Sequence, residues 1–260
     1  MQNFKIGIQL YTLREQLNGD FLGCLKELAS MGYEGVEFAG MYGGLTPEQL
    51  AKELRKINLS VCGMHLPIAA IMDPNSDAYC YAKALNCKYL VTSLAGDFID
   101  NFEEVVDNCR QAGQVAAEQG RCFVYHNHAQ EFQKINGVCA LDLFYEQTSA
   151  EQVKAELDTY WIKKGGEDPV TYLKKYAERS PLIHIKDMDK IDGSFAAVGT
   201  GSIDLPGVIS IAFNSIAEWL IYEQDACSSD PLECARTSIY NIKAEKYIIS
   251  RTQIMETSKC

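Results

Sequence analysis

Eight short β-rich runs alternate with amphipathic stretches along the chain, and this alternation restricts the fold more than any other feature. The runs are "KIGIQL", "GVEFAG", "SVCGMHL", "KYLVTSL", "CFVYHNH", "VKAELD", "LIHIKDMD" and "EWLIYEQD". Strands that alternate with helices pair in parallel and are buried on both faces. Eight such units in 260 residues match the size of a closed (β/α)₈ barrel. The sequence therefore predicts an α/β fold with one TIM-barrel domain over residues 1–260.

The stretches between the runs carry helix signals. In residues 46–58, Thr46 can cap the helix, Pro47 fills the first turn and Glu48 lies early. Gly32 is suited to end the helix predicted over residues 20–32. The rival fold is an open doubly wound sheet, which usually has a glycine-rich phosphate loop after the first strand. "QLYTLREQ" has no glycine there, and "GTGSID" (199–204) lies late in the chain, so we favour the closed barrel.

The bulk composition excludes several classes of partner. A net charge of −11 and the absence of any basic run argue against a nucleic-acid partner. No stretch of 18 apolar residues predicts a membrane span. The start "MQNFKIGIQL" lacks the apolar core of a signal peptide. The ten cysteines are scattered without a C-x-x-C pair, which favours reduced, packed thiols. We expect a cytoplasmic protein, and the sequence leaves open an export leader that has been removed.

Polar residues gather where the predicted strands end. Active sites of TIM barrels form at the C-terminal ends of the strands. All four histidines of the chain fall at such ends, together with several carboxylates: Glu37, His65, His126, His128, Asp158, His184 and Glu223. A single histidine there is more often structural, and an aspartate after a strand often caps the next turn. The coincidence of several strand ends therefore indicates a common site, whereas the cysteines are assigned to core packing.

Carboxylates and imidazoles without cysteine suit one divalent Mn, Mg, Co or Zn ion with open coordination positions. Such an ion can polarise a carbonyl and hold a neighbouring hydroxyl. A carboxylate beside it can then move a proton on the adjacent carbon, through an enediolate that the metal stabilises. This chemistry predicts a substrate with a carbonyl next to a carbon that bears a hydroxyl.

Six segments resemble the sugar phosphate isomerase/epimerase family, which has a xylose-isomerase-like TIM barrel. They are "IGIQLYTLRE", "GYEGVEFAG", "YHNHAQEF", "AELDTYW", "HIKDMD" and "YEQD". The resemblance implies one divalent metal, often Mn, with Glu, Asp, His and Glu ligands from the last four strands. By position the last three ligands are Asp158, His184 and Glu223. For the first ligand we choose Glu131, the only acid in its motif, with His126 as the rival.

The resemblance also implies roles around the substrate. Glu131 and Glu223 would form a proton shuttle on opposite sides of the sugar. Other pocket residues are expected to bind substrate hydroxyls, stabilise the oxyanion or wall the pocket: Tyr11, Glu37, His65, His126, His128, Trp161 and Lys186. An ion pair of Lys186 with Asp187 or Asp158 is the alternative for that lysine, and Arg14 is a candidate contact for a phosphate.

The leading prediction is a metal-dependent isomerase or epimerase of a keto sugar or related polyol. A lyase or dehydratase acting on a keto-sugar or keto-inositol is the close alternative, because it begins with the same proton abstraction. A non-catalytic sugar-binding barrel is a third possibility. A DNA-repair endonuclease of this superfamily is disfavoured by the four histidines and the charge of −11. By analogy with related barrels we expect a homodimer or homotetramer.

Overall fold

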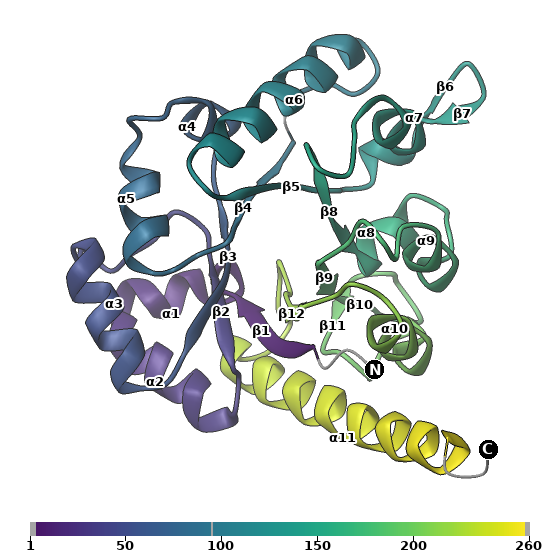
Figure 1. Ribbon diagram of the computed structural model, residues 1–260. Coiled ribbons are helices and arrows are strands. Elements are labelled where there is room, and N and C mark those ends of the chain that lie inside the picture. Colours follow the sequence, from purple (N-terminus) through teal and green to yellow (C-terminus); the bar gives the residue numbers. More distant parts are fainter. Residues whose placement is uncertain (1–3, 95, 258–260) are drawn as a thin grey trace.

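A computed structural model describes residues 4–94 and 96–257. Within them, eight parallel strands close into a barrel in the order β1-β12-β9-β8-β5-β4-β3-β2 (Figure 1). The barrel strands are β1 (Lys5–Gln9), β2 (Gly35–Phe38), β3 (Ser60–His65), β4 (Tyr89–Ser93), β5 (Cys122–His126), β8 (Lys154–Asp158), β9 (Leu182–Ile185) and β12 (Trp219–Tyr222). The first and last strands pair directly, with Lys5 opposite Trp219. The predicted (β/α)₈ barrel is thus confirmed.

The predicted helices surround the barrel (Figure 1). They are α2 (Phe21–Met31), α3 (Pro47–Lys56), α5 (Asp77–Ala84), α6 (Phe102–Glu118), α7 (Ala140–Gln147), α9 (Pro169–Lys175), α10 (Leu205–Phe213) and α11 (Pro231–Thr257). As expected, Gly32 ends α2 with a φ of 94°. Thr46 and Gln49 form a capping box at the start of α3, because each side chain bonds the other's backbone N–H. These local signals were readable without tertiary context.

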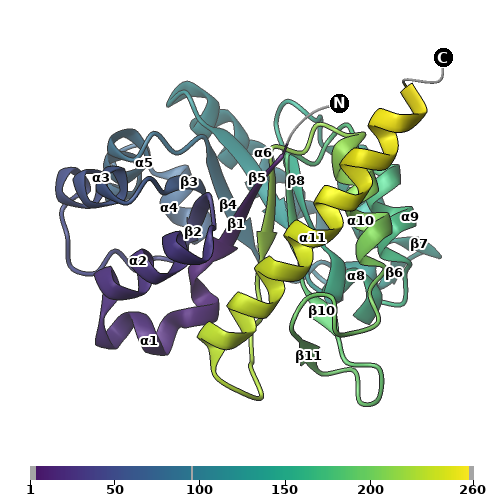
Figure 2. The same cartoon turned by 90° about the horizontal axis from the view of Figure 1, so that it is seen from below.

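Short additional elements decorate the strand ends. They are η1 (Leu10–Leu13), α1 (Arg14–Gly19), α4 (Ile68–Met72), η2 (Gln130–Phe132), α8 (Thr159–Lys164), and the hairpins β6 (Lys134–Ile135) with β7 (Val138–Cys139) and β10 (Asp187–Met188) with β11 (Phe195–Ala196). Figure 2 shows α1 and the β10–β11 hairpin extending from the same end of the barrel. The predicted seventh run "LIHIKDMD" is therefore divided, since β9 belongs to the barrel and β10 to the hairpin.

The barrel interior changes character along its axis. Near the N-terminal ends of the strands, a small apolar cluster packs, including Tyr89, Val124 and Trp219. Successive side chains of a strand alternate between its two faces. On β8 this places Glu156 and Asp158 on one face, and both are fully buried. The C-terminal half of the barrel thus holds buried ionisable groups in place of a hydrocarbon core.

The "GTGSID" loop surrounds a carboxylate of the chain itself. Asp187 accepts hydrogen bonds from the backbone N–H of Gly199 (2.9 Å), Gly201 (2.9 Å) and Ile203 (3.0 Å). The backbone N–H donors of the loop are therefore occupied by the Asp187 carboxylate, and these bonds fix the chain after the β10–β11 hairpin. In addition, no helix within the described residues is long and apolar enough to cross a membrane.

Candidate active site at the C-terminal end of the barrel

Two buried carboxylates, Glu37 and Glu156, form the inner layer of the site. Glu156 Oε2 lies 2.8 Å from His65 Nε2, 3.0 Å from His126 Nδ1 and 3.3 Å from His184 Nε2. Glu37 Oε2 lies 2.6 Å from His184 Nε2 and 3.2 Å from His65 Nε2. Both carboxylates are fully buried. Three imidazoles are consequently held by two anions at the centre of the barrel.

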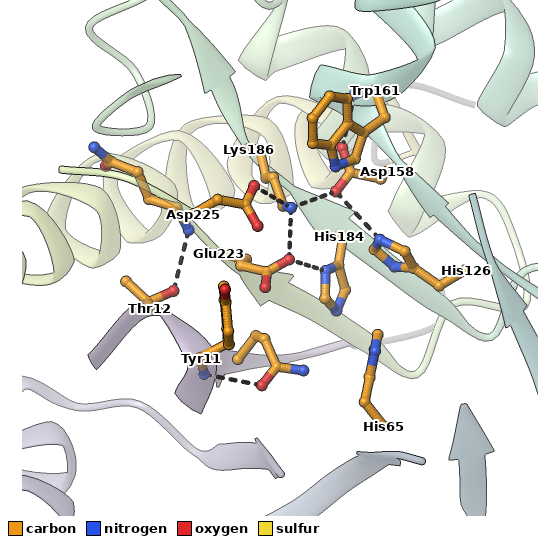
Figure 3. Close-up of polar contacts among 12 residues, drawn as sticks. Tyr11, Thr12, His65, His126, Asp158, Trp161, His184, Lys186, Glu223 and Asp225 are labelled. Atoms are coloured by element: carbon orange, nitrogen blue, oxygen red, sulfur yellow. Dashed lines mark hydrogen bonds and ion pairs between the residues drawn. The ribbon is translucent and has the colours of Figure 1, made fainter. Parts of the chain in front are cut away.

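The outer layer contains His126, Asp158, His184 and Glu223. Each can offer one ligand atom, and these atoms all lie within 4.8 Å of one another. His184 Nδ1 is 3.0 Å from Glu223 Oε2, and His126 Nε2 is 3.8 Å from Asp158 Oδ2. Figure 3 shows these side chains converging from neighbouring strands. Two imidazoles and two carboxylates are a suitable donor set for one divalent cation.

The hydrogen-bond pattern supports this use of the outer layer. His126 Nδ1 faces Glu156 and His184 Nε2 faces Glu37, so the other nitrogen of each ring is directed at the outer layer. In the metal-free structure His184 Nδ1 also bonds Glu223. Burial opposes the charged ring, but Glu156 and Glu37 raise the pKa of His184 well above its ordinary value, and a bound cation would take the place of the Nδ1 proton. Metal-ligating histidines typically have such a carboxylate on their second nitrogen. Burial holds the pKa of His126 well below its ordinary value, so the ring is neutral as ligation requires. The buried Asp158 Oδ2 lies 3.8 Å from His126 Nε2 and 3.2 Å from Lys186 Nζ, so this oxygen is already directed at cationic and metal-ligating groups. The residues present therefore fit a metal ion.

Lys186 lies against the same outer carboxylates. Its Nζ is 2.7 Å from Glu223, 2.7 Å from Asp225 and 3.2 Å from Asp158. Burial disfavours the ammonium, but these three carboxylates raise the pKa of Lys186 above its ordinary value. The ion pair with Asp158, one of the two alternatives considered for this lysine, is present. Asp187 instead serves the "GTGSID" loop.

Glu131 lies apart from the ligand group. Its carboxylate accepts hydrogen bonds from Tyr125 Oη (2.9 Å) and from the backbone N–H of His128 (2.9 Å). Glu131 follows β5 in the short helix η2, where its side chain is buried. The group of four side chains that could hold an ion contains His126, the rival candidate, and does not contain Glu131. This placement does not bring Glu131 and Glu223 together as a pair, and their shuttle remains a prediction.

A pocket of about 240 Å³ opens above the ligand group. It is lined by Gln9, Tyr11, Ala39, His65, Ser93, Leu94, His126, His128, Glu223 and Asp225. Burial, followed by the charge of Lys186, lowers the pKa of His128 to about 4, so that imidazole is neutral at physiological pH. The His128 ring lies 5.1 Å from the Trp161 ring. Arg14 stacks on the Tyr11 ring and bonds the Tyr11 carbonyl.

Sequence reasoning missed Glu156, Asp225 and Gln9. Glu156 precedes Asp158 by two positions, so the period of the strand places both on the same face. Asp225 follows Glu223 at the same interval in "YEQD". Gln9 donates to Glu37 Oε2 at 2.8 Å. The twofold alternation was thus a usable signal for Glu156, whereas Asp225 lies beyond the end of β12 and the contact of Gln9 with Glu37 depends on the pairing of β1 with β2.

A closed parallel barrel with buried histidines and carboxylates at its C-terminal end is the architecture of TIM-barrel enzymes. A profile of the xylose isomerase-like TIM barrel family matches residues 25–243, and the chain belongs to this family.

Similar proteins include both dehydratases and epimerases. An inosose dehydratase of Clostridium botulinum is 27% identical over 278 residues, covering 90% of each chain. The structure of a sugar phosphate isomerase/epimerase from Parabacteroides distasonis superposes with a TM-score of 0.77 at 23% identity, covering 95% of this chain and 98% of that one. A 3-keto-D-glucoside 4-epimerase from E. coli superposes with a TM-score of 0.72 at 16% identity, covering 93% and 100%. These relatives of the present chain are thus enzymes that modify sugars.

Proposed function

We propose that the chain is a metal-dependent dehydratase that removes a proton next to the carbonyl of a keto-inositol or keto-sugar and then expels water. The observation that carries the proposal is a ligand set for one divalent cation below a pocket with carboxylates on one wall and imidazoles on the other. The name of the Clostridium relative, an inosose dehydratase, supports the dehydration outcome over the isomerase predicted first. We propose Mn²⁺ as the metal, with Zn²⁺, Co²⁺ and Mg²⁺ as alternatives.

The barrel order separates the two walls of the pocket. Glu223 and Asp225 follow β12, whereas His65 ends β3 and His128 follows β5, on the far side of the barrel. A substrate between these walls therefore meets a base on one side and imidazoles on the other. The volume of about 240 Å³ lies slightly below the usual range of ligand pockets, which favours a substrate no larger than a single sugar ring.

The residues divide the proton transfers between them. His126, Asp158, His184 and Glu223 would hold the cation, which when bound supplies Lewis-acid polarisation of the substrate carbonyl. The Lys186 and His184 charges, working against burial, hold the pKa of Glu223 well below its ordinary value. Its ionised carboxylate accepts the proton from the carbon beside the carbonyl. The bond from the next carbon to its hydroxyl then breaks, and the hydroxyl leaves as water with a proton from His65.

Epimerisation is the second candidate, because a group on each wall of the pocket allows a proton to leave one face and return to the other. In that case one of the imidazoles on the far wall returns the proton to the same carbon. The two outcomes share their first step and differ in whether a carbon–oxygen bond breaks. The product, not the pocket, distinguishes them.

The test is incubation of the Mn²⁺-loaded protein with a keto-inositol and a panel of keto-sugars in D₂O. Loss of water gives an unsaturated ketone, which is followed by ultraviolet absorbance and by NMR. We expect this product, with deuterium exchange at the carbon next to the carbonyl. Exchange with inversion but without water loss would instead establish the epimerase. Absence of exchange with every compound, in protein verified to contain metal, would overturn both.

A further inference from the structure

Lys186 is a buried cation to which the proposed chemistry gives no contact with the substrate. Its side chain is 1% exposed, and it is absent from the pocket lining. Its ammonium is surrounded by carboxylates on one side and by the rings of Trp161 (5.5 Å) and Phe195 (5.8 Å) on the other. Figure 3 shows the ammonium directed at three carboxylates at once. A buried charge with this many partners needs a reason beyond substrate binding.

The partners of Lys186 overlap with the predicted metal ligands. Asp158 and Glu223 belong to the group of four that can hold an ion, and Asp225 does not. Lys186 Nζ lies 2.7 Å from Glu223 Oε2, the same oxygen that faces His184 Nδ1. It also lies 3.2 Å from Asp158 Oδ2, the oxygen that faces His126 Nε2. The ammonium and a metal ion would therefore compete for the same two carboxylates.

The charges of the outer layer favour holding both cations together. Asp158, Glu223 and Asp225 carry three negative charges when ionised. Lys186 and the charged His184 together leave one of these charges without compensation, whereas Lys186 with a divalent ion that replaces the His184 proton balances all three. Two cations a few ångströms apart repel each other strongly in a buried site. The ammonium consequently needs one partner that the metal does not use, and Asp225, 2.7 Å away, is that partner.

We propose that Lys186 is a built-in counter-cation of the metal site, which neutralises Asp158 and Glu223 in the metal-free protein and withdraws toward Asp225 when a divalent cation binds. This inference rests on the metal dependence in the proposed function. It assigns Lys186 and Asp225 to the control of metal affinity and makes them positioning residues of the site.

The test is calorimetric titration of chelator-stripped protein with Mn²⁺. The variants are Lys186→Met, Asp225→Asn and the double variant, with Asp100→Asn as a control that removes an exposed carboxylate. Lys186→Met is expected to bind Mn²⁺ about tenfold more tightly, because no ammonium competes for the ligands. Asp225→Asn is expected to bind about tenfold more weakly, because the displaced ammonium has lost its remaining partner. In the Lys186→Met background, the effect of Asp225→Asn should fall below about twofold.

The outcomes separate this inference from the proposed function. Absence of Mn²⁺ binding to the wild type would overturn the metal-dependent function, and the inference with it. Normal wild-type binding that does not tighten in Lys186→Met would overturn the inference alone. An equal effect of Asp225→Asn with and without the lysine would also overturn it, because it would show simple attraction between Asp225 and the metal. Thermal unfolding confirms that each variant folds, and Lys186→Gln replaces Lys186→Met if the latter does not.

Discussion

The buried Glu156 offers a sharp test of the two-layer site. In Glu156→Gln, a carboxylate that faces three imidazole nitrogens becomes an amide of the same shape. An amide presents one oxygen and two N–H donors, so only part of these contacts can survive. His126 and His184 then lose an anion that orients them, and their lone pairs are no longer fixed toward the outer layer. We expect Glu156→Gln to fold and to bind a divalent metal weakly.

The magnitude follows from the number of ligands that Glu156 serves. Loss of a carboxylate behind a metal ligand typically weakens binding about 10- to 100-fold. Glu156 Oε2 contacts two predicted ligands, at 3.0 Å and 3.3 Å, whereas Glu37 Oε2 still holds His184 at 2.6 Å. We therefore expect a loss near the upper end, about 100-fold, which corresponds to about 2.7 kcal/mol.

The assay is Mn²⁺ titration of the chelator-stripped variant by calorimetry, beside wild type and Glu131→Gln. Glu131 is fully buried like Glu156 but lies outside the ligand group, so its variant should bind Mn²⁺ as wild type does. Wild-type affinity in Glu156→Gln would refute the reasoning. Loss of metal in Glu131→Gln with binding retained in Glu156→Gln would establish Glu131 as the first ligand in place of His126 in the proposed set.

Three further predictions concern stability and the inner layer. Arg179 donates to the carbonyls of Tyr145, Thr148 and Val153 in a buried position; Arg179→Met should lower the free energy of unfolding by about 3–5 kcal/mol, measured in urea, because several buried acceptors lose their donor. Burial opposes protonation of His65, but Glu37 and Glu156 raise its pKa from 6.5 to about 10. In the metal-free protein, the contribution of protonated His65 to the free energy of unfolding should be present below pH 6.5 and lost as the pH rises through about 10. Urea unfolding at several pH values measures it, and an equally steep decrease in His65→Asn would contradict this assignment. A Cβ at Gly63 would collide with Glu37 Oε1, so Gly63→Ala should weaken Mn²⁺ binding about tenfold or more, and unchanged calorimetric affinity would show that Glu37 does not orient His184.

Local sequence signals predicted the elements of the fold with few errors. The Thr46 cap and the Gly32 stop were visible because capping and left-handed conformations depend on neighbouring residues only. The division of "LIHIKDMD" was not visible, since the strand continues in pattern while β10 leaves the barrel to pair with β11. That change depends on Asp187, whose partners lie 12 to 16 residues further along the chain.

The location of the site was predicted, but the contacts among its side chains were not. Histidines at strand ends could be located from strand periodicity, and the barrel rule predicts that they meet. The choice of Glu131 over His126 as first ligand rested on residue type alone, whereas the side chains that lie together depend on contacts between strands. The period of "AELD" could have placed Glu156 on the same face as Asp158, but not against the three imidazoles, which come from other strands.

The sequence by itself determined the barrel, its eight units and the face on which polar residues gather, because hydrophobic periodicity and strand alternation are properties of short segments. Only the tertiary structure decided which carboxylate holds which imidazole and where the Lys186 ammonium lies. These contacts join residues from different strands, such as Glu37 with His184 across 147 positions. Their geometry is set by the closure and register of the whole barrel, which no short segment encodes.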